Sequence, residues 1–210
     1  MNIPTLPKEN QVASRSNIII SALSLVGVIS CSAMLVPETS DPYKKLDQVT
    51  FLMNSGRPIP SERLIWESIA IFSKNGDKKG LAKAYDEYGF FLRSPLVARN
   101  SDRYLKSGFI DNTITLDNRL AKSIEYFEKA KTLFIELDQP DLLCHVCYNM
   151  GISYALMNQI DSACSAYDAS LKYNKENIQR NPNAKPIAPN GYATLEEYLL
   201  YCKQKAGCQR

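Results

Sequence analysis

The sequence predicts an all-α protein, and an internal repeat with helical spacing is the main reason. Residues 84–92 and 146–154 share the pattern large-x-x-large-Gly-x-x-large, with the glycines at Gly89 and Gly151. Residues three and four positions apart lie on one face of an α-helix, so both segments are predicted to be helices. A second segment with helical spacing follows each of them. These patterns predict helices that follow one another in pairs.

The first predicted pair precedes the repeat. It comprises residues 41–54, which carry an apolar stripe, and residues 61–72, whose start is indicated by Ser61 and Glu62. The second and third pairs begin with the glycine-centred helices. Their second helices share small, aromatic and small residues at spacings of four and three, namely Ser123, Phe127 and Ala130, then Ala163, Tyr167 and Ser170.

The second pair contains an insertion. Ser123 follows Gly89 by 34 residues, whereas Ala163 follows Gly151 by only 12, so about 22 extra residues lie at roughly 94–117. The insertion mixes basic and aromatic residues without helical or strand periodicity, and we expect a long loop. Long loops often carry function, and Arg and Tyr are common in binding hot spots. Its candidate partner-binding residues are Arg99, Arg103, Tyr104 and Phe109. The alternative is a solvated loop with no role.

The chain after the third pair, residues 175–210, is predicted to form a proline-rich loop and one last helix. Thr194 and Glu197 have the spacing of a capping box, which places the start of that helix at about residue 194. A last helix of this kind caps the open end of a stack of helix pairs.

Residues 41–174 resemble the tetratricopeptide repeat, in which the glycine of the first helix lets the second helix approach closely. The resemblance implies that the pairs are antiparallel and stack into a short curved array whose groove, lined by the first helices, binds a partner. The groove-facing candidates, counted in register from the glycines, are Phe90, Arg93, His145, Tyr148, Asn149 and Ile152. The alternative is that the last helix or the insertion partly fills the groove. The carboxylate clamps of the family need a recurrent Lys-Asn pair, and only Asn149 is present here.

The N-terminus carries a twelve-residue apolar run, residues 18–29, after a polar start with Lys8 and Arg15. With Ser30 and Cys31 after it, the segment resembles a bacterial lipoprotein signal. The resemblance implies a signal peptide at 1–30, acylation of Cys31 and a tether at 31–40. It also implies a location in the cell envelope, on the outer membrane and facing the periplasm. An uncleaved anchor helix is the alternative, but twelve residues fall short of the roughly 20 that span a bilayer.

Five further cysteines follow, and the odd number predicts at least one free thiol. Cys202 and Cys208 could close a short C-terminal loop by a disulfide. Cys144 and Cys147 have the spacing of half a zinc site, but no second half exists, so we expect buried thiols and no metal or cofactor.

No enzyme signature is present: the chain has no Gly-rich phosphate loop and no His-Glu-x-x-His motif, and it has one histidine. Removing residues 1–30 removes two of the 25 basic and one of the 22 acidic residues, so the net charge becomes about +2 and gives no reason to expect nucleic acid. The sequence therefore predicts a non-enzymatic, lipid-anchored protein that binds a protein partner. The specific expectation is an immunity protein against a secreted toxic effector, such as a type VI secretion phospholipase. The alternatives are an assembly or pilotin-type lipoprotein, and an envelope enzyme that uses the repeats as a scaffold.

Overall fold

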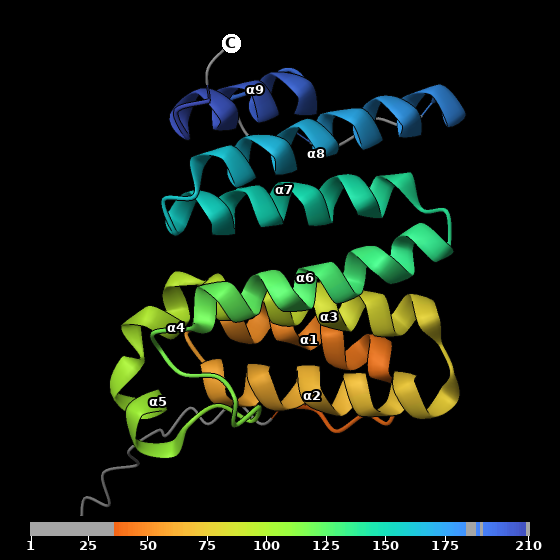
Figure 1. The fold of residues 1–210 in the computed structure, drawn as a ribbon. Coiled ribbons are helices and arrows are strands. Elements are labelled where there is room, and N and C mark those ends of the chain that lie inside the picture. Colours follow the sequence, from red (N-terminus) through yellow and green to blue (C-terminus); the bar gives the residue numbers. More distant parts are fainter. Residues whose placement is uncertain (1–35, 184–187, 190, 209–210) are drawn as a thin grey trace, which may run out of the picture. The chain divides into compact units, whose positions relative to one another are not determined.

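The computed structural model describes residues 36–183, 188–189 and 191–208, and these residues form helices and loops only (Figure 1). Residues 36–210 belong to one compact unit. The expected signal peptide, the acylated Cys31 and the first half of the tether, residues 31–35, lie outside the described residues. The helices, in chain order, are α1 (Pro42–Asn54), α2 (Pro58–Asn75), α3 (Lys78–Arg93), α4 (Pro95–Arg99), α5 (Ser101–Ser107), α6 (Arg119–Glu136), α7 (Pro140–Leu156), α8 (Ile160–Arg180) and α9 (Leu195–Lys205).

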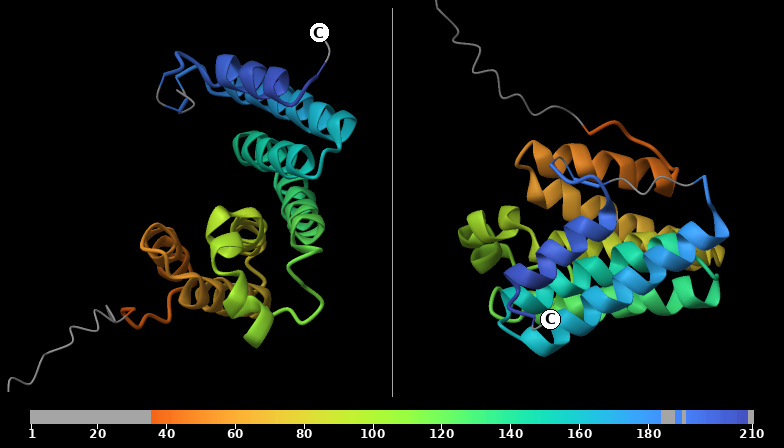
Figure 2. Two further views of the ribbon diagram at one scale, coloured as in Figure 1. Left: turned by 90° about the vertical axis from the view of Figure 1, so that its left-hand side faces the viewer. Right: turned by 90° about the horizontal axis from the view of Figure 1, so that it is seen from above.

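The long helices pack mainly on their neighbours in the chain. The most extensive contacts join α1 to α2, α3 to α6 and α7 to α8, while α2 with α3, α6 with α7 and α8 with α9 connect these pairs. Figures 1 and 2 show the helices following one another from α1 and α2 at one end of the unit to α8 and α9 at the other. The all-α prediction is therefore confirmed for the described part of the chain.

At each of the two repeat glycines, an aromatic ring of the paired helix lies against the glycine backbone. A Cβ atom on Gly89 would lie 2.7 Å from the Phe127 ring, and one on Gly151 would lie 2.5 Å from the Tyr167 ring. Real Cβ atoms do not approach other atoms that closely, so only glycine permits these contacts without rearrangement. The sequence analysis missed a third such contact, that of Gly80 with Phe72 between α3 and α2.

The helix starts agree with the sequence in one place and differ in another. Thr194 caps α9, because its Oγ1 accepts a hydrogen bond from the Glu197 amide at 3.1 Å, as the capping-box spacing predicted. The start expected at Ser61 is wrong by one turn. Helix α2 begins at Pro58, a residue favoured at the first helical position, and the Ser61 hydroxyl instead donates to the Arg57 carbonyl.

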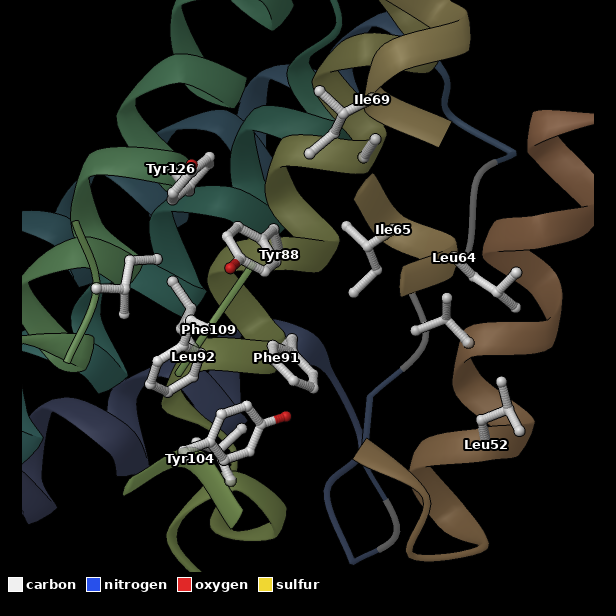
Figure 3. Packing of buried hydrophobic residues seen from close by; sticks show 14 of the residues in the cluster. Leu52, Leu64, Ile65, Ile69, Tyr88, Phe91, Leu92, Tyr104, Phe109 and Tyr126 are labelled. Atoms are coloured by element: carbon white, nitrogen blue, oxygen red, sulfur yellow. The ribbon is translucent and has the colours of Figure 1, made fainter. Parts of the chain in front are cut away.

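The insertion is not the irregular loop that its composition suggested, because it contains α4 and α5. The Tyr104 and Phe109 rings stack with their centroids 4.2 Å apart and lie in the core with Phe91 and Tyr88 (Figure 3). The buried carboxylate of Glu62 on α2 connects the insertion to this core. Its Oε1 accepts hydrogen bonds from the Tyr88 hydroxyl and from the backbone amide of residue 110, each at 2.9 Å.

The predicted disulfide between Cys202 and Cys208 is wrong. Cys208 pairs with Cys164 near the start of α8, with their Cα atoms 5.7 Å apart. Helix α9 lies along α8, which brings the chain just beyond α9 to Cys164, whereas Cys202 points into the contact between the two helices as a free thiol. Cys144 and Cys147 are free and buried, as expected.

Candidate functional site

A network of polar side chains connects α3 to α7. Arg93 on α3 donates from Nη2 to Asn149 Oδ1 at 2.5 Å, and Asn149 Nδ2 donates to Asp86 Oδ1 at 3.4 Å. Asp86 Oδ2 lies 3.1 Å from His145 Nδ1. We call the face formed by Asp86, Phe90, Arg93, His145 and Asn149 the α3–α7 surface. It joins residues more than 50 positions apart in the sequence, and four of the five were predicted to bind a partner.

The residues of this surface differ in solvent exposure. Exposed side chains can contact a partner, whereas buried ones hold the two helices in place. Phe90 is 40% exposed, and the His145 side chain is 58% exposed. Asn149 is 1% exposed, which contradicts the expectation that it is accessible to a partner. Its amide instead holds the two helices together through its bonds to Arg93 and Asp86. On the α3–α7 surface, the structure thus leaves Phe90 and His145 as the most accessible predicted contacts.

Arg93 presents a charged group beside an aromatic ring. Its guanidinium carbon lies 5.0 Å from the centre of the Phe90 ring, within the range of a cation–π interaction. Its Nε is buried, and no group in the described part of the chain accepts a hydrogen bond from it. Burial lowers the pKa of Arg93, and nearby Tyr148 and Asp86 oppose that shift, so the group stays charged.

Two titratable groups beside the network have raised pKa values. Burial raises the pKa of Glu87 on α3 to about 7, with a further rise from the Asp86 charge and an opposing effect of His145. Burial acts to lower the pKa of His145, but its hydrogen bond and charge interaction with Asp86 outweigh burial and raise it. Perturbed pKa values of this kind are typical of functional sites, although structural networks also produce them.

The last helix covers part of the expected groove. The Tyr148 hydroxyl on α7 lies 2.7 Å from the Tyr198 hydroxyl on α9, and Ile152 packs against the cluster around Leu199. Tyr148 and Ile152 are consequently half-buried. Helix α9 therefore covers the part of α7 that carries these two predicted contact residues.

The insertion keeps two of its predicted contact residues at the surface. Arg99 and Arg103 are exposed, whereas Tyr104 and Phe109 are 4% and 6% exposed. The prediction that these two aromatic residues are accessible to a partner is wrong, because they fill the core under α3. Sequence alone did not separate these roles, since short helices α4 and α5 give no long periodic signal.

A cavity of about 400 Å³ adjoins the α3–α7 surface between α7, α8 and the segment leading into α9, and His145 lies at its edge. Of the nine residues that line it, two, His145 and Tyr148, were sequence-based candidates, and the other seven, including Asn174 and Tyr198, were not. Asn174 did leave a signal, because it continues the buried α8 face of Ala163, Tyr167 and Ser170 with a polar side chain.

No three His, Cys, Asp or Glu side chains lie together as a metal-binding group among the described residues. Nor does any described helix have the length and apolar composition needed to cross a membrane. No protein-family model matches this chain, and no curated protein or solved structure matches it either. The functional argument therefore depends on the α3–α7 surface and the cavity beside it.

Proposed function

We propose that this protein is a lipid-anchored, tetratricopeptide-repeat-like protein of the cell envelope that binds a protein partner at the α3–α7 surface. The repeat-like arrangement is supported by the close helix contacts at Gly89 and Gly151 and by the direct contacts of α3 with both α1 and α7. In such an array the first helices of successive pairs line the groove. The predicted first helices here are α1, α3 and α7.

The observation that carries the proposal is the convergence of Phe90, Arg93 and His145 on one face. An exposed aromatic ring lies against an arginine, and a histidine held by Asp86 lies on the neighbouring helix. Aromatic residues and arginine dominate binding hot spots because they bury large areas and form directional hydrogen bonds.

Within this proposal, the specific candidate is an immunity protein that neutralises a secreted toxic effector, such as a type VI secretion phospholipase. A lipid anchor on Cys31 would keep the inhibitor at the membrane where such an enzyme acts. The alternative is an assembly or pilotin-type lipoprotein on the periplasmic side of the outer membrane. The partner's identity distinguishes the two roles.

The test is affinity purification from envelope and secreted fractions with residues 32–210 as bait, followed by mass spectrometry. The matched baits are the double variant Arg93→Ala, His145→Ala and the control Arg63→Ala, which removes an exposed arginine of α2. We expect the double variant to lose the partner and the control to keep it. A toxic hydrolase that binds one-to-one and loses activity supports immunity, whereas pilus, secretin or outer-membrane assembly proteins support the assembly role. Retention of the same partner by the double variant would refute binding at the α3–α7 surface.

One observation favours a second candidate, an envelope enzyme. Glu87 has a pKa near 7 and lies beside Asp86 and His145, and a carboxyl group with such a pKa suits general acid–base catalysis near neutral pH. The enzyme candidate predicts hydrolysis of phospholipid vesicles or peptidoglycan by the purified protein, with a loss of rate in Glu87→Gln. Absence of turnover on both substrates, together with partner capture, would leave the binding role.

A further inference from the structure

The cavity beside the α3–α7 surface is lined by an asparagine whose side chain has no hydrogen-bond partner among the described residues. Asn174 on α8 is 4% exposed, and it lines the cavity of about 400 Å³ between α7, α8 and the segment leading into α9. No hydrogen bond of its side chain is found within the described part of the chain, and its amide atoms are not among the fully enclosed polar atoms without a partner, so they face the open space of the cavity. The cavity itself is the space into which a complementary group can come.

The rest of the cavity wall determines which chemistry fits. It is mostly apolar and is formed in large part by Tyr148, Leu195 and Tyr198, with the Asn177 amide near Asn174 on the next turn of α8. Among the described residues no lysine or arginine lines it, and its two ionisable residues, Asp141 and His145, are both exposed to solvent rather than buried with Asn174. The volume falls in the range of roughly 300 to 1,000 Å³ that is usual for small ligand pockets. An uncharged ligand with an apolar part and at least one hydrogen-bonding group is the match.

We propose that this cavity binds a peptide segment of the protein partner, with an apolar side chain against Tyr148, Tyr198 and Leu195 and a peptide group hydrogen-bonded to Asn174. A peptide group offers one donor and one acceptor, which an asparagine amide can pair with simultaneously. A saccharide carries hydroxyls around its ring, and most of them would face apolar walls without partners. A hydrocarbon chain would leave Asn174 unpaired.

The position of the cavity also indicates a peptide of the partner. His145 lies both at the edge of the cavity and on the α3–α7 surface, so one polypeptide can contact the surface and insert a residue into the cavity. This inference rests on the proposed partner-binding function. Its test is nevertheless independent of partner capture.

The experiment uses residues 32–210, because residues 36–210 form a compact unit of their own. The ¹⁵N-labelled protein is titrated with N-acetyl-L-leucinamide, which contains an apolar side chain between two peptide groups. N-acetylglucosamine and isoamyl alcohol are the comparison ligands, the first a sugar with an amide and the second an apolar group without one. We expect saturable shifts of the Asn174 side-chain resonances and the Tyr198 backbone amide with N-acetyl-L-leucinamide, at millimolar concentrations suited to so small a ligand.

The variant Asn174→Leu keeps the approximate volume and removes the amide. We expect its affinity for N-acetyl-L-leucinamide, followed at Tyr198, to fall about fivefold, the value of one neutral hydrogen bond. Its melting temperature should be unchanged or higher, because no hydrogen bond within the described protein is lost. The control Asn54→Leu, on the exposed end of α1, should bind like the wild type.

Three results would overturn the inference: no saturable shift, stronger binding of N-acetylglucosamine, or equal binding of isoamyl alcohol with no effect of Asn174→Leu. A lower melting temperature in Asn174→Leu would also count against it, since that result indicates a structural amide. If the cavity binds no peptide probe but partner capture still requires Arg93 and His145, the proposed function stands and this inference fails. If the probe binds but no partner is captured, the peptide site in the cavity stands and the proposed function fails.

Discussion

The raised pKa of Glu87 makes a quantitative prediction about stability. The carboxyl group titrates near pH 7 in the folded protein, compared with an ordinary value of 4.5, chiefly because it is buried beside Asp86. Since the folded-state pKa is the higher one, the folded state favours the protonated form. The protonated Glu87 carboxyl group therefore contributes its full stabilisation of the folded state below pH 4.5. This stabilisation is lost as the pH rises through 7.

The magnitude follows from the size of the shift. Each pKa unit corresponds to about 1.4 kcal/mol, so a rise from 4.5 to about 7 costs the folded state about 3 kcal/mol once Glu87 is ionised. Integration over the two titration curves gives a cost of about 1 kcal/mol at pH 5 and about 3 kcal/mol at pH 8. The change Glu87→Gln removes the ionisable group with little change in shape. We expect the variant to be more stable than the wild type, and its advantage to grow by about 2 to 3 kcal/mol between pH 5 and pH 8.

The assay is urea denaturation of residues 32–210 followed by circular dichroism at the two pH values. The free energy of unfolding of each variant is compared with that of the wild type at the same pH, so that other titrating groups cancel to first order. The control Glu196→Gln removes an exposed carboxylate of α9 and accounts for the change in net charge. An equal difference at both pH values would refute the reasoning, because it would mean that Glu87 titrates alike in the folded and unfolded states. A destabilised Glu87→Gln at pH 8 would show that the ionised carboxylate has a favourable partner.

Three further predictions concern the fold. Gly151→Ala should lower the free energy of unfolding by about 1 to 3 kcal/mol, because the new Cβ meets the Tyr167 ring at 2.5 Å; a neutral effect in urea denaturation would contradict that close contact. Cys208→Ser should destabilise the protein by about 4 kcal/mol, because it opens the loop that the disulfide closes over a sequence separation of 44 residues. Cys202→Ser should have a small effect, since Cys202 is a free thiol. The reverse ranking of the two variants in thermal denaturation would contradict the observed pairing. Glu62→Ala should cost about 3 kcal/mol and speed amide hydrogen exchange in the insertion, because it leaves a buried tyrosine hydroxyl and a backbone amide without their acceptor; unchanged exchange there would exclude a role in holding the insertion.

The sequence determined the helices and their contact faces where the signal was periodic. The glycines at 89 and 151 and the aromatic residues that follow them predicted which face of each helix is buried, and the structure has Phe127 and Tyr167 against those glycines. This works because the 3.6-residue period places a known set of residues on one face, and a missing Cβ permits close approach there. The same reasoning predicted that Phe90 and Arg93 lie on the opposite face of α3.

The tertiary structure alone decided the contacts between distant segments. Periodicity could not show that Tyr104 belongs to the core or that Cys208 reaches Cys164, because these outcomes depend on how short helices and the last helix dock. That the Asn174 amide faces a cavity and has no partner within the described part of the chain was equally hidden, since the partner of a polar residue on an inward face depends on what the neighbouring elements place beside it. Local pattern sets which side of an element faces inward, whereas the partner that each side chain meets depends on the packing of elements far apart in the chain.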